Sequence, residues 1–490
     1  MLLLAILWTI VVAIWLAIAV RRLNFSRLPI SYALGGSLAI IMGSVFGYEF
    51  FHIPAPIPIT SDRAIVGGLT LIFAIFFIRR QQKIQPLTMM DFSVYGLLAV
   101  LLTSAILTDT QFNKNLPISR FVFFYFLPAL LYFVVRNSKI GKIDLQIIAG
   151  SLILFSAYLA LTAVAEWKGL HGLVFPRYIT VATFTEFLGR GRGPFLNPIS
   201  NGIFLTAGLA MAMMAFFCCK GKIKWVIAAT VPILFVGNIA TLTRSVWLGM
   251  LIVVGTIVAT TTNRKQKGAL LIAGTLGAIL LLTTVGSNLI NFKRDKNVSL
   301  NEMSKSAQLR PIFAEIAWKM FKDRPLLGCG FGQYDKYNPD YLRGAHTRQP
   351  LEKAKPYLQH NVILAMLTET GIVGTGFLLM LLINALKIGV SNFLNTNSNP
   401  WEQAFAAMLI AILISYIVNG MFHDVAIIPM AHMLLFYVVA INVVTYQNQP
   451  SISLITMFSN WVKTILNQNL KTDSLPQLPL FEKDYIQPQQ

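Results

Sequence analysis

Charged side chains are scarce in this chain and make up 12% of its 490 residues. Soluble domains carry about 25% charged residues, so the composition excludes a string of ordinary soluble domains. Hydrophobic residues make up 55% of the sequence, and they recur in long apolar runs with short polar breaks. The composition therefore predicts an all-α fold, a polytopic integral membrane helical bundle of about 12–13 transmembrane helices.

Cysteine and the usual cofactor motifs are also scarce. The three cysteines, Cys218, Cys219 and Cys329, offer neither metal-ligand spacing nor a disulfide framework. No HExxH, carboxylate cluster or Cys/His set suggests a metal site, and the glycine-rich "GCGFGQY" lacks the Lys-Ser/Thr of a nucleotide loop. We therefore expect no metal and no cofactor, and a substrate that carries its own leaving group.

Acidic residues are outnumbered two to one, with 20 Asp and Glu against 40 Lys and Arg, which gives a net charge of +20. In a soluble protein this excess would suggest nucleic-acid binding. In a membrane protein it is the expected composition of the cytoplasmic loops. Since no zinc-finger or RNA-binding aromatic motif is present, we expect membrane lipids and no nucleic acid among the partners.

Apolar runs of the length of a membrane span recur along the whole sequence, and a span needs about 20 such residues. The first run lacks the basic segment and cleavage site of a signal peptide, so it is predicted to be a retained span. The thirteen predicted spans are 1–20, 30–48, 63–79, 91–107, 119–136, 146–166, 198–219, 223–240, 245–262, 269–287, 361–386, 402–419 and 425–446.

Alternate loops are basic, which predicts the orientation of the chain. "RRQQK", "RNSKIGK", "KGKIK" and "NRKQK" each carry three Lys or Arg, whereas the opposing "FHIPAPIPITSD" and "NGMFHD" carry no Lys or Arg. Basic short loops face the cytoplasm. The expected layout is a bundle over 1–287 with an outer loop at 167–197, a large periplasmic loop over 288–360, transmembrane helices over 361–446, and a partly disordered cytoplasmic tail at 447–490.

Several arginines break this pattern because they are predicted to lie on the outer side. The loop segment "FLGRGRGPFLNPISNG" holds Arg190 and Arg192, and the turn "ATLTRSVWLG" holds Arg244. A single arginine near a span end commonly extends to the lipid headgroups. These arginines stand beside glycine or serine, which lets an anion approach the backbone, and a guanidinium binds phosphate through two parallel hydrogen bonds. Together they predict an anion-binding site.

A histidine stands where the polar loop meets the next apolar run, in "KPYLQHNVILAMLTETGIVG". His360 is predicted to lie at the depth of the outer arginines, and a neutral imidazole accepts a proton near pH 7. Nearby arginines would keep it unprotonated. Glu369 is a poor partner for it, because nine residues of helix span about 13.5 Å and place the two on opposite faces. Glu369 is instead expected to be a buried polar packing residue.

Two further features belong to the predicted outer side. His423 and Asp424, in "NGMFHDV", form a second candidate pair, which a capping turn between two spans explains equally well. The segment "SAQLRPIFAEIAWKMFKDRP" predicts an amphipathic helix that ends before Pro325 and suits the membrane surface. Its predicted apolar face consists of Phe313, Ile316, Ala317, Met320 and Phe321.

Four segments together resemble the O-antigen ligase and O-antigen polymerase superfamily of bacterial inner-membrane proteins. They are "RGRGPFLNPISNG", "TLTRSVWLG", "LRPIFAEIAWKMFKDRPLLGCGFGQY" and "QHNVILAMLTETGIVG", in this order around one large outer loop. The resemblance implies a GT-C-like helical bundle in the bacterial inner (plasma) membrane, with its active site facing the periplasm. It implies a glycosyltransferase that moves a glycan from undecaprenyl diphosphate to an acceptor hydroxyl, with inversion and without metal or nucleotide.

The resemblance also implies roles for individual residues. His360 matches the histidine proposed to activate the acceptor, while Arg190 and Arg244 match arginines that hold the donor diphosphate. Arg192 has no counterpart, so either Arg190 or Arg192 could contact phosphate. Arg310 matches an arginine of the loop helix and is a possible supporting residue, as are His423 and Asp424.

The acceptor stays open at this level. It is a glycan for a polymerase, lipid A-core for a ligase, or a protein. A different class, a transporter of a small anion such as bicarbonate, is the alternative. A transporter would place ionisable groups near the bilayer midplane, often on broken or repeated helices. The predicted spans are nearly free of charge at their centres and show no internal repeat, which favours the enzyme.

Overall fold

The computed structural model describes residues 31–53, 58–108, 117–181, 187–260, 268, 300–342, 360–395 and 398–447, and the regular elements of these ranges are helices. The α-helices are α2 (Tyr32–Val45), α3 (Ser61–Ile78), α4 (Met89–Thr108), α5 (Pro117–Phe121), α6 (Leu127–Arg136), α7 (Lys142–Lys168), α8 (Pro198–Cys218), α9 (Gly221–Ala240), α10 (Arg244–Thr260), α12 (Leu300–Asp323), α13 (Tyr334–Leu342), α14 (Val362–Leu394), α15 (Pro400–Gly420) and α16 (Pro429–Gln447). A π-helical turn, η1 (Val122–Phe126), joins α5 to α6, and short 3₁₀ turns include η2 (His171–Leu173), η4 (Gly193–Phe195) and η7 (Val425–Ile427).

The prediction of an all-α, polytopic membrane protein is confirmed. Nine helices in the described ranges are long and apolar enough to cross a membrane, with α5, η1 and α6 forming one span. The shorter apolar helices α2 and α10 correspond to two further predicted spans. The predicted spans 1–20 and 269–287 and the tail beyond 447 lie outside the described residues. Helices α8, α15 and α16 are the most deeply buried and form the centre of the bundle.

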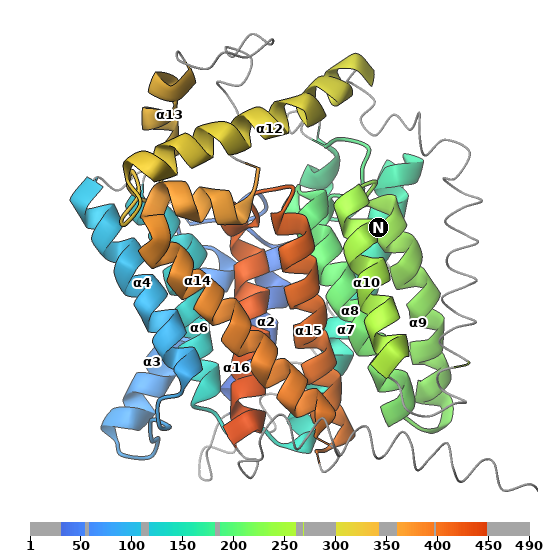
Figure 1. Ribbon diagram of the computed structural model, residues 1–490. Helices are drawn as coiled ribbons and strands as arrows, with labels where there is room; N and C mark the ends of the chain where they lie inside the picture. Colours follow the sequence, from blue (N-terminus) through green and yellow to red (C-terminus); the bar gives the residue numbers. More distant parts are fainter. Residues whose placement is uncertain are drawn as a thin grey trace, which may run out of the picture.

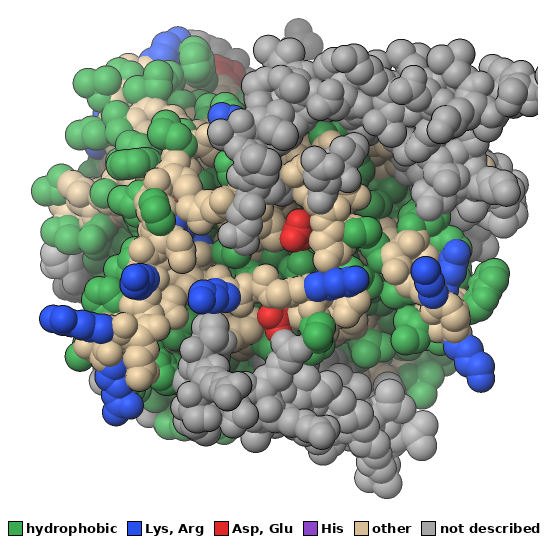
Figure 2. Space-filling view, turned by 90° about the horizontal axis from the view of Figure 1, so that it is seen from below, with side chains coloured by type: hydrophobic (Ala, Val, Ile, Leu, Met, Phe, Trp, Pro, Cys, Tyr) green, Lys and Arg blue, Asp and Glu red, His purple; other side chains and the backbone are tan. Residues whose placement is uncertain are grey.

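The two ends of the bundle differ in what covers them. Helix α12 lies across one end, called here the α12 end, where α2, α7, α9 and α15 finish and α3, α8, α10, α14 and α16 begin (Figure 1). The opposite end, called the basic end, carries the described Lys- and Arg-rich connections. Figure 2 shows Lys and Arg side chains distributed over it. The basic residues of these connections are Arg79, Arg80, Lys83, Arg136, Lys139, Lys142, Lys220, Lys222 and Lys224.

Helix α14 is broken near its start, which the sequence did not predict. Gly371 has φ +63° and ψ −159°, so the helix is interrupted at this residue. In Figure 1 the first part of α14 lies beneath α12 and the second part descends through the bundle. A side chain at Gly371 would clash, because a Cβ would lie 2.3 Å from the carbonyl oxygen of Leu326.

The segment 325–330 completes the hydrogen bonds of the broken helix. The N–H of Ile372 donates to the carbonyl of Pro325 (2.8 Å), and the N–H of Cys329 donates to the carbonyl of Thr368 (2.8 Å). The N–H of Gly330 likewise donates to the carbonyl of Glu369 (3.0 Å). Irregular backbone is stable next to a membrane only when protein satisfies its polar groups, and this loop does so.

Helix α12 covers the α12 end with its apolar face turned inward. Phe313, Ile316 and Met320 are buried in one cluster with Cys329 and Tyr334, and the helix packs on α13 and α14. It ends at Asp323, as Pro325 predicts. The suggestion that its apolar face suits the membrane surface is wrong, because that face is covered by protein. Phe321 lies at the margin of this face and is only half-buried.

Candidate functional site

His360 is held at the α12 end by the residue that follows it. The side chain of Asn361 caps α14 by accepting hydrogen bonds from the N–H groups of Ile363 (2.9 Å) and Leu364 (3.1 Å). Its amide also donates to the carbonyl of Met421 at the end of α15 (3.3 Å). His360 itself has φ +51°, a left-handed conformation that histidine adopts more readily than most residues. The cap therefore fixes where the imidazole lies.

Two separate elements contribute side chains around the imidazole, α12 and the α15–α16 loop. The ring of Phe313, from α12, lies 5.8 Å from it, and the ring of His423, from the α15–α16 loop, lies 6.3 Å from it. Burial lowers the pKa of His360, and the positive charge of Arg310 lowers it further. The guanidinium of Arg310 lies 5.4 Å above the ring of Phe422. His360, Arg310 and His423 therefore form one cluster, called the histidine cluster, in which the imidazole favours its neutral form at pH 7.

Asp424 belongs to a set of charged residues, with Arg120 and Glu369, that the sequence did not reveal. Its carboxylate accepts the N–H of Ala426 (3.1 Å) and caps η7, as the capping-turn alternative predicts. Burial raises the pKa of Asp424 to about 7, against the lowering effect of Arg120, while Glu369 raises it further. Arg120 is paired with Glu369 (3.5 Å), which also accepts the N–H of Gly332 (2.9 Å). Glu369 is buried, as predicted.

Arg190 and Arg244 come together at the turn between α9 and α10. Arg190 is buried and donates to the carbonyl of Thr241 (3.3 Å) and to the hydroxyl of Thr243 (2.5 Å). Arg244 follows Thr243 directly, begins α10 and is exposed. The N–H of Gly191 donates to the carbonyl of Ala240 (2.8 Å). Two segments about fifty residues apart are thereby joined at one turn.

Arg192 lies on the other side of its loop. It is fully buried, lies 3.8 Å from Glu166 of α7 and donates to the carbonyl of Ile179 (2.6 Å). Glu166 also accepts the N–H of Gly193 (2.8 Å). A buried charge that has a carboxylate partner fixes the loop against α7. The structure therefore separates Arg192 from the turn that holds Arg190 and Arg244.

The end of α15 lies between the histidine cluster and the α9–α10 turn. On one side Met421 accepts a hydrogen bond from Asn361. On the other side α10 packs closely on α15, where a Cβ at Gly249 would lie 3.6 Å from Ser415 and 4.0 Å from Asn419. Helix α15 thus forms a common wall for both groups, and both lie at the α12 end (Figure 1).

Left-handed backbone is concentrated at this end. Within the described residues, five residues other than glycine have positive φ, and Arg80 is the one at the basic end. The other four are Phe187, Leu196, Leu242 and His360. Such conformations cost about 1–3 kcal/mol each and cluster where a site needs fixed geometry. Their positions beside Arg190, Arg244 and the imidazole mark this end as the candidate active site.

A comparison with known protein families matches residues 228–379 to a family model. The matching family is described as O-antigen ligase. The matched segment runs from α9 into α14, so it includes Arg244, Arg310 and His360. No curated protein matches the chain. The match confirms the resemblance to the O-antigen ligase and polymerase superfamily that the motifs predict.

Proposed function

Because residues 228–379 form an O-antigen ligase domain, which indicates a lipid-linked glycan transferase, we propose that this protein moves a glycan from undecaprenyl diphosphate to an acceptor hydroxyl. The reaction takes place at the α12 end. The observation that carries the proposal is the histidine cluster, in which a partly buried imidazole lies near Arg310 and has a lowered pKa. A neutral imidazole is the protonation state that a general base requires.

The reaction is a single displacement. The imidazole of His360 accepts the proton of the acceptor hydroxyl while that oxygen attacks the anomeric carbon of the donor. A new carbon–oxygen bond forms on one side of the carbon, and the bond to the diphosphate breaks on the other. The diphosphate leaves with the bonding electron pair, so the configuration at the anomeric carbon is inverted.

The diphosphate needs positive charge as its own negative charge grows, and arginines supply it. Arg244, exposed at the first position of α10, is the principal contact, and Arg190, bonded to the preceding Thr243, supports the same turn. Preorganised donors aimed at developing charge make a large contribution to catalysis. Between the two candidates in the "RGRG" loop we favour Arg190, because Arg192 already faces the carboxylate of Glu166.

The orientation of the protein follows from its charge distribution. The basic end carries the Lys- and Arg-rich connections (Figure 2), so it faces the cytoplasm together with the C-terminus. The α12 end then faces the periplasm of the bacterial inner membrane. A lipid diphosphate anchored in that membrane presents its phosphates at this depth.

The alternative, transport of a small anion, is less well supported. The buried ionisable residues in the described helices lie near helix ends or near the break in α14, and include Asp91, Arg136, Glu166 and Glu369. A transporter of the kind considered would hold such groups near the midplane. The break at Gly371 is also at the α12 end, where loop 325–330 forms hydrogen bonds with the backbone on both sides of it.

The proposal is tested with purified protein, a lipid-diphosphate-linked glycan and candidate acceptors. His360→Ala should lower transfer by about 10²–10⁴-fold, because it removes the general base. His171→Ala, at an exposed histidine in η2 at the same end, should leave transfer unchanged. A longer glycan would identify a polymerase, and glycosylated lipid A-core or protein a ligase. Transfer that survives in His360→Ala would remove this residue from the mechanism.

A further inference from the structure

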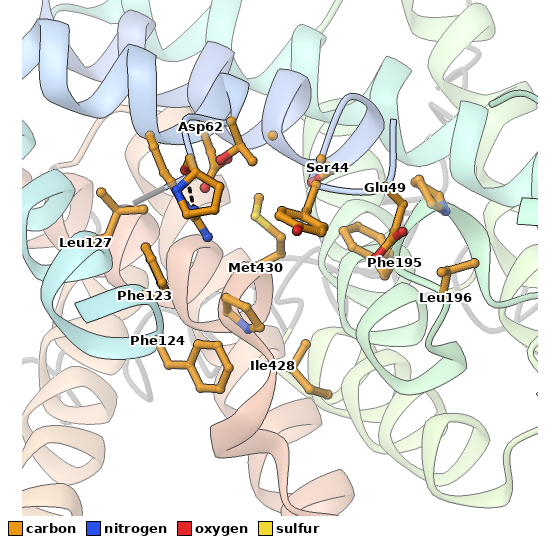
Figure 3. Close-up of a pocket in the computed structure, with 18 of the residues that line it drawn as sticks. Ser44, Glu49, Asp62, Phe123, Phe124, Leu127, Phe195, Leu196, Ile428 and Met430 are labelled. Atoms are coloured by element: carbon orange, nitrogen blue, oxygen red, sulfur yellow. Dashed lines mark hydrogen bonds between the residues drawn. The ribbon is translucent and has the colours of Figure 1, made fainter. Parts of the chain in front are cut away.

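A cavity of about 560 Å³ opens at the α12 end, apart from the histidine cluster and the α9–α10 turn. It is lined by the end of α2, the start of α3, α5, η1, and the loop segments 194–196 and 428–430 (Figure 3). Its volume lies in the range of about 300–1,000 Å³ typical of small-molecule pockets. The two loop segments are the continuations of those that carry Arg190 and His423.

Three buried polar atoms on this cavity have no hydrogen-bond partner among the residues that the structure describes. They are the hydroxyl oxygens of Ser44 and Ser119 and the Nε of Arg63. The serines are 2% and 1% exposed, and the three residues come from α2, α5 and α3. An unsatisfied buried polar group costs about 1–3 kcal/mol. Three such groups from three helices on one cavity indicate a ligand that supplies hydrogen bonds.

The rest of the lining defines the chemistry of that ligand. Aromatic rings supply flat faces, and the guanidinium of Arg63 lies 3.7 Å above the ring of Phe123. The carboxylates of Glu49 and Asp62 accept hydrogen bonds and repel anions. In the view of Figure 3, Asp62, Ser44 and Glu49 lie along one side of the pocket and Phe124 and Ile428 along the other.

These groups discriminate between the possible ligands. A diphosphate is disfavoured because two carboxylates line the cavity, and an acyl chain is disfavoured because it would leave the serines and Arg63 unsatisfied. A sugar satisfies both requirements, since its hydroxyls donate to carboxylates and accept from serine and arginine, while its apolar face lies on an aromatic ring.

We propose that this pocket, called the α2–α3 pocket, is a saccharide subsite that binds sugar units of the glycan other than the one that reacts. The inference rests on the proposed function. His360 and Arg244 do not line the pocket, so a sugar bound there is remote from the reacting carbon. It lies behind the two loops that carry Arg190 and His423, where a glycan chain extending from the active site reaches it.

The test measures glycan binding and transfer separately, with the full chain in lipid nanodiscs. The binding probe is the free oligosaccharide released by mild acid from the lipid-linked glycan of the source cells, followed by saturation-transfer NMR. Arg63→Leu and the double variant Ser44→Ala/Ser119→Ala should each weaken binding at least about tenfold. In transfer assays they should raise KM for the glycan and leave kcat unchanged.

The controls are an arginine and a serine that do not line the pocket. Arg79→Leu, at the exposed far end of α3, and Ser151→Ala, in α7 and bonded to the carbonyl of Ile147, should bind the oligosaccharide as the wild type does. A thermal unfolding curve for each variant identifies any loss of fold, and the milder serine variant provides a second reading if Arg63→Leu unfolds.

The outcomes separate this inference from the proposed function. Transfer with no saturable oligosaccharide binding, or with binding that the pocket variants leave intact, overturns the subsite and leaves the transferase proposal standing. Saturable binding that the pocket variants weaken, in a protein that transfers nothing, supports the subsite and contradicts the proposed function. Competition by inorganic diphosphate at the same site would overturn the inference in favour of an anion site.

Discussion

The basic end contains a buried ion pair, whereas the α12 end contains the histidine cluster and the α2–α3 pocket. At the basic end, Asp91 accepts from the N–H and hydroxyl of Thr88 (2.6 and 2.7 Å) and from Tyr132 (2.8 Å), and it pairs with Arg136 (3.0 Å). Arg136 also donates to the carbonyl of Pro86 (2.7 Å). The charges of Asp91 and Arg136 are thus paired within the chain, and this pair should stabilise the fold.

The α12 end contains groups whose partners are missing or whose geometry is strained. The serines and Arg63 of the α2–α3 pocket have unsatisfied atoms, His360 has a left-handed backbone, and the pKa of Asp424 rises to about 7. Strain and unsatisfied groups persist where a function needs them. Substitutions in the Asp91–Arg136 pair should therefore change stability, and substitutions in the histidine cluster and the α2–α3 pocket should change binding and turnover.

The largest effect is expected at the basic end. Arg136→Met leaves the carboxylate of Asp91 buried without its charge partner, which costs about 3–5 kcal/mol. The midpoint of thermal unfolding should fall clearly, while the transfer rate per folded molecule stays at the wild-type value. The double variant Asp91→Leu/Arg136→Met should be more stable than Arg136→Met alone. Wild-type stability in Arg136→Met would show that the Asp91–Arg136 ion pair does not stabilise the fold.

Two glycine substitutions in α14 test the break in this helix by thermal unfolding. Gly371→Ala places a Cβ 2.3 Å from the carbonyl oxygen of Leu326 and forces a residue with a side chain into φ +63°. The strained backbone alone costs about 1–3 kcal/mol. Gly376→Ala, in the same helix with no atom within 4 Å of the added Cβ, is the control and should be neutral in thermal unfolding. Equal stability of the two variants would contradict the break.

These examples also show how far the sequence predicts the molecule. Apolar length predicted the spans: the predicted 198–219 is α8 (Pro198–Cys218) and the predicted 402–419 lies within α15 (Pro400–Gly420). Local composition also predicted the loop helix and its end before Pro325. These features depend on residues that are close together in the sequence, so a single sequence is enough to predict them.

Features that join distant segments escaped prediction. The pairs Arg120–Glu369 and Arg192–Glu166 join different parts of the chain, and neither partner lies in a local motif that names the other. The break at Gly371 could not be predicted, because its positive φ depends on loop 325–330 bonding to the helix on both sides of the break. The glycine-rich "GCGFGQY" was the available signal, since a run of glycines next to a helix permits such backbone contact.

The two arginines of the "RGRG" loop repeat the comparison on a smaller scale. Arg190→Lys should raise KM for the lipid-linked donor about tenfold, because lysine lacks the planar fork that holds two acceptors at once. It should also lower the unfolding midpoint, because Arg190 is buried and bonded to Thr241 and Thr243. Arg192→Lys, whose partner Glu166 is structural, should lower the unfolding midpoint and leave the donor KM unchanged. If Arg192→Lys raised the donor KM and Arg190→Lys did not, the donor contact would belong to Arg192.

The smallest effect concerns the pH dependence of transfer. Arg310 and burial both lower the pKa of His360, and His423 is the other titratable ring beside it. Because the base works in its neutral form, transfer falls as the pH drops through the pKa of His360. Arg310→Gln removes one of the two lowering influences, so this pKa should rise toward its ordinary value of about 6.5. The acid limb of kcat/KM then moves to higher pH, and transfer at pH 6 falls relative to pH 8 more than in the wild type.

Arg324→Gln, at an arginine beside Tyr337 just after α12, is the control and should keep the wild-type profile. An unchanged profile in Arg310→Gln would mean that burial alone keeps the imidazole neutral, so the charge of Arg310 would have no part in activating the base.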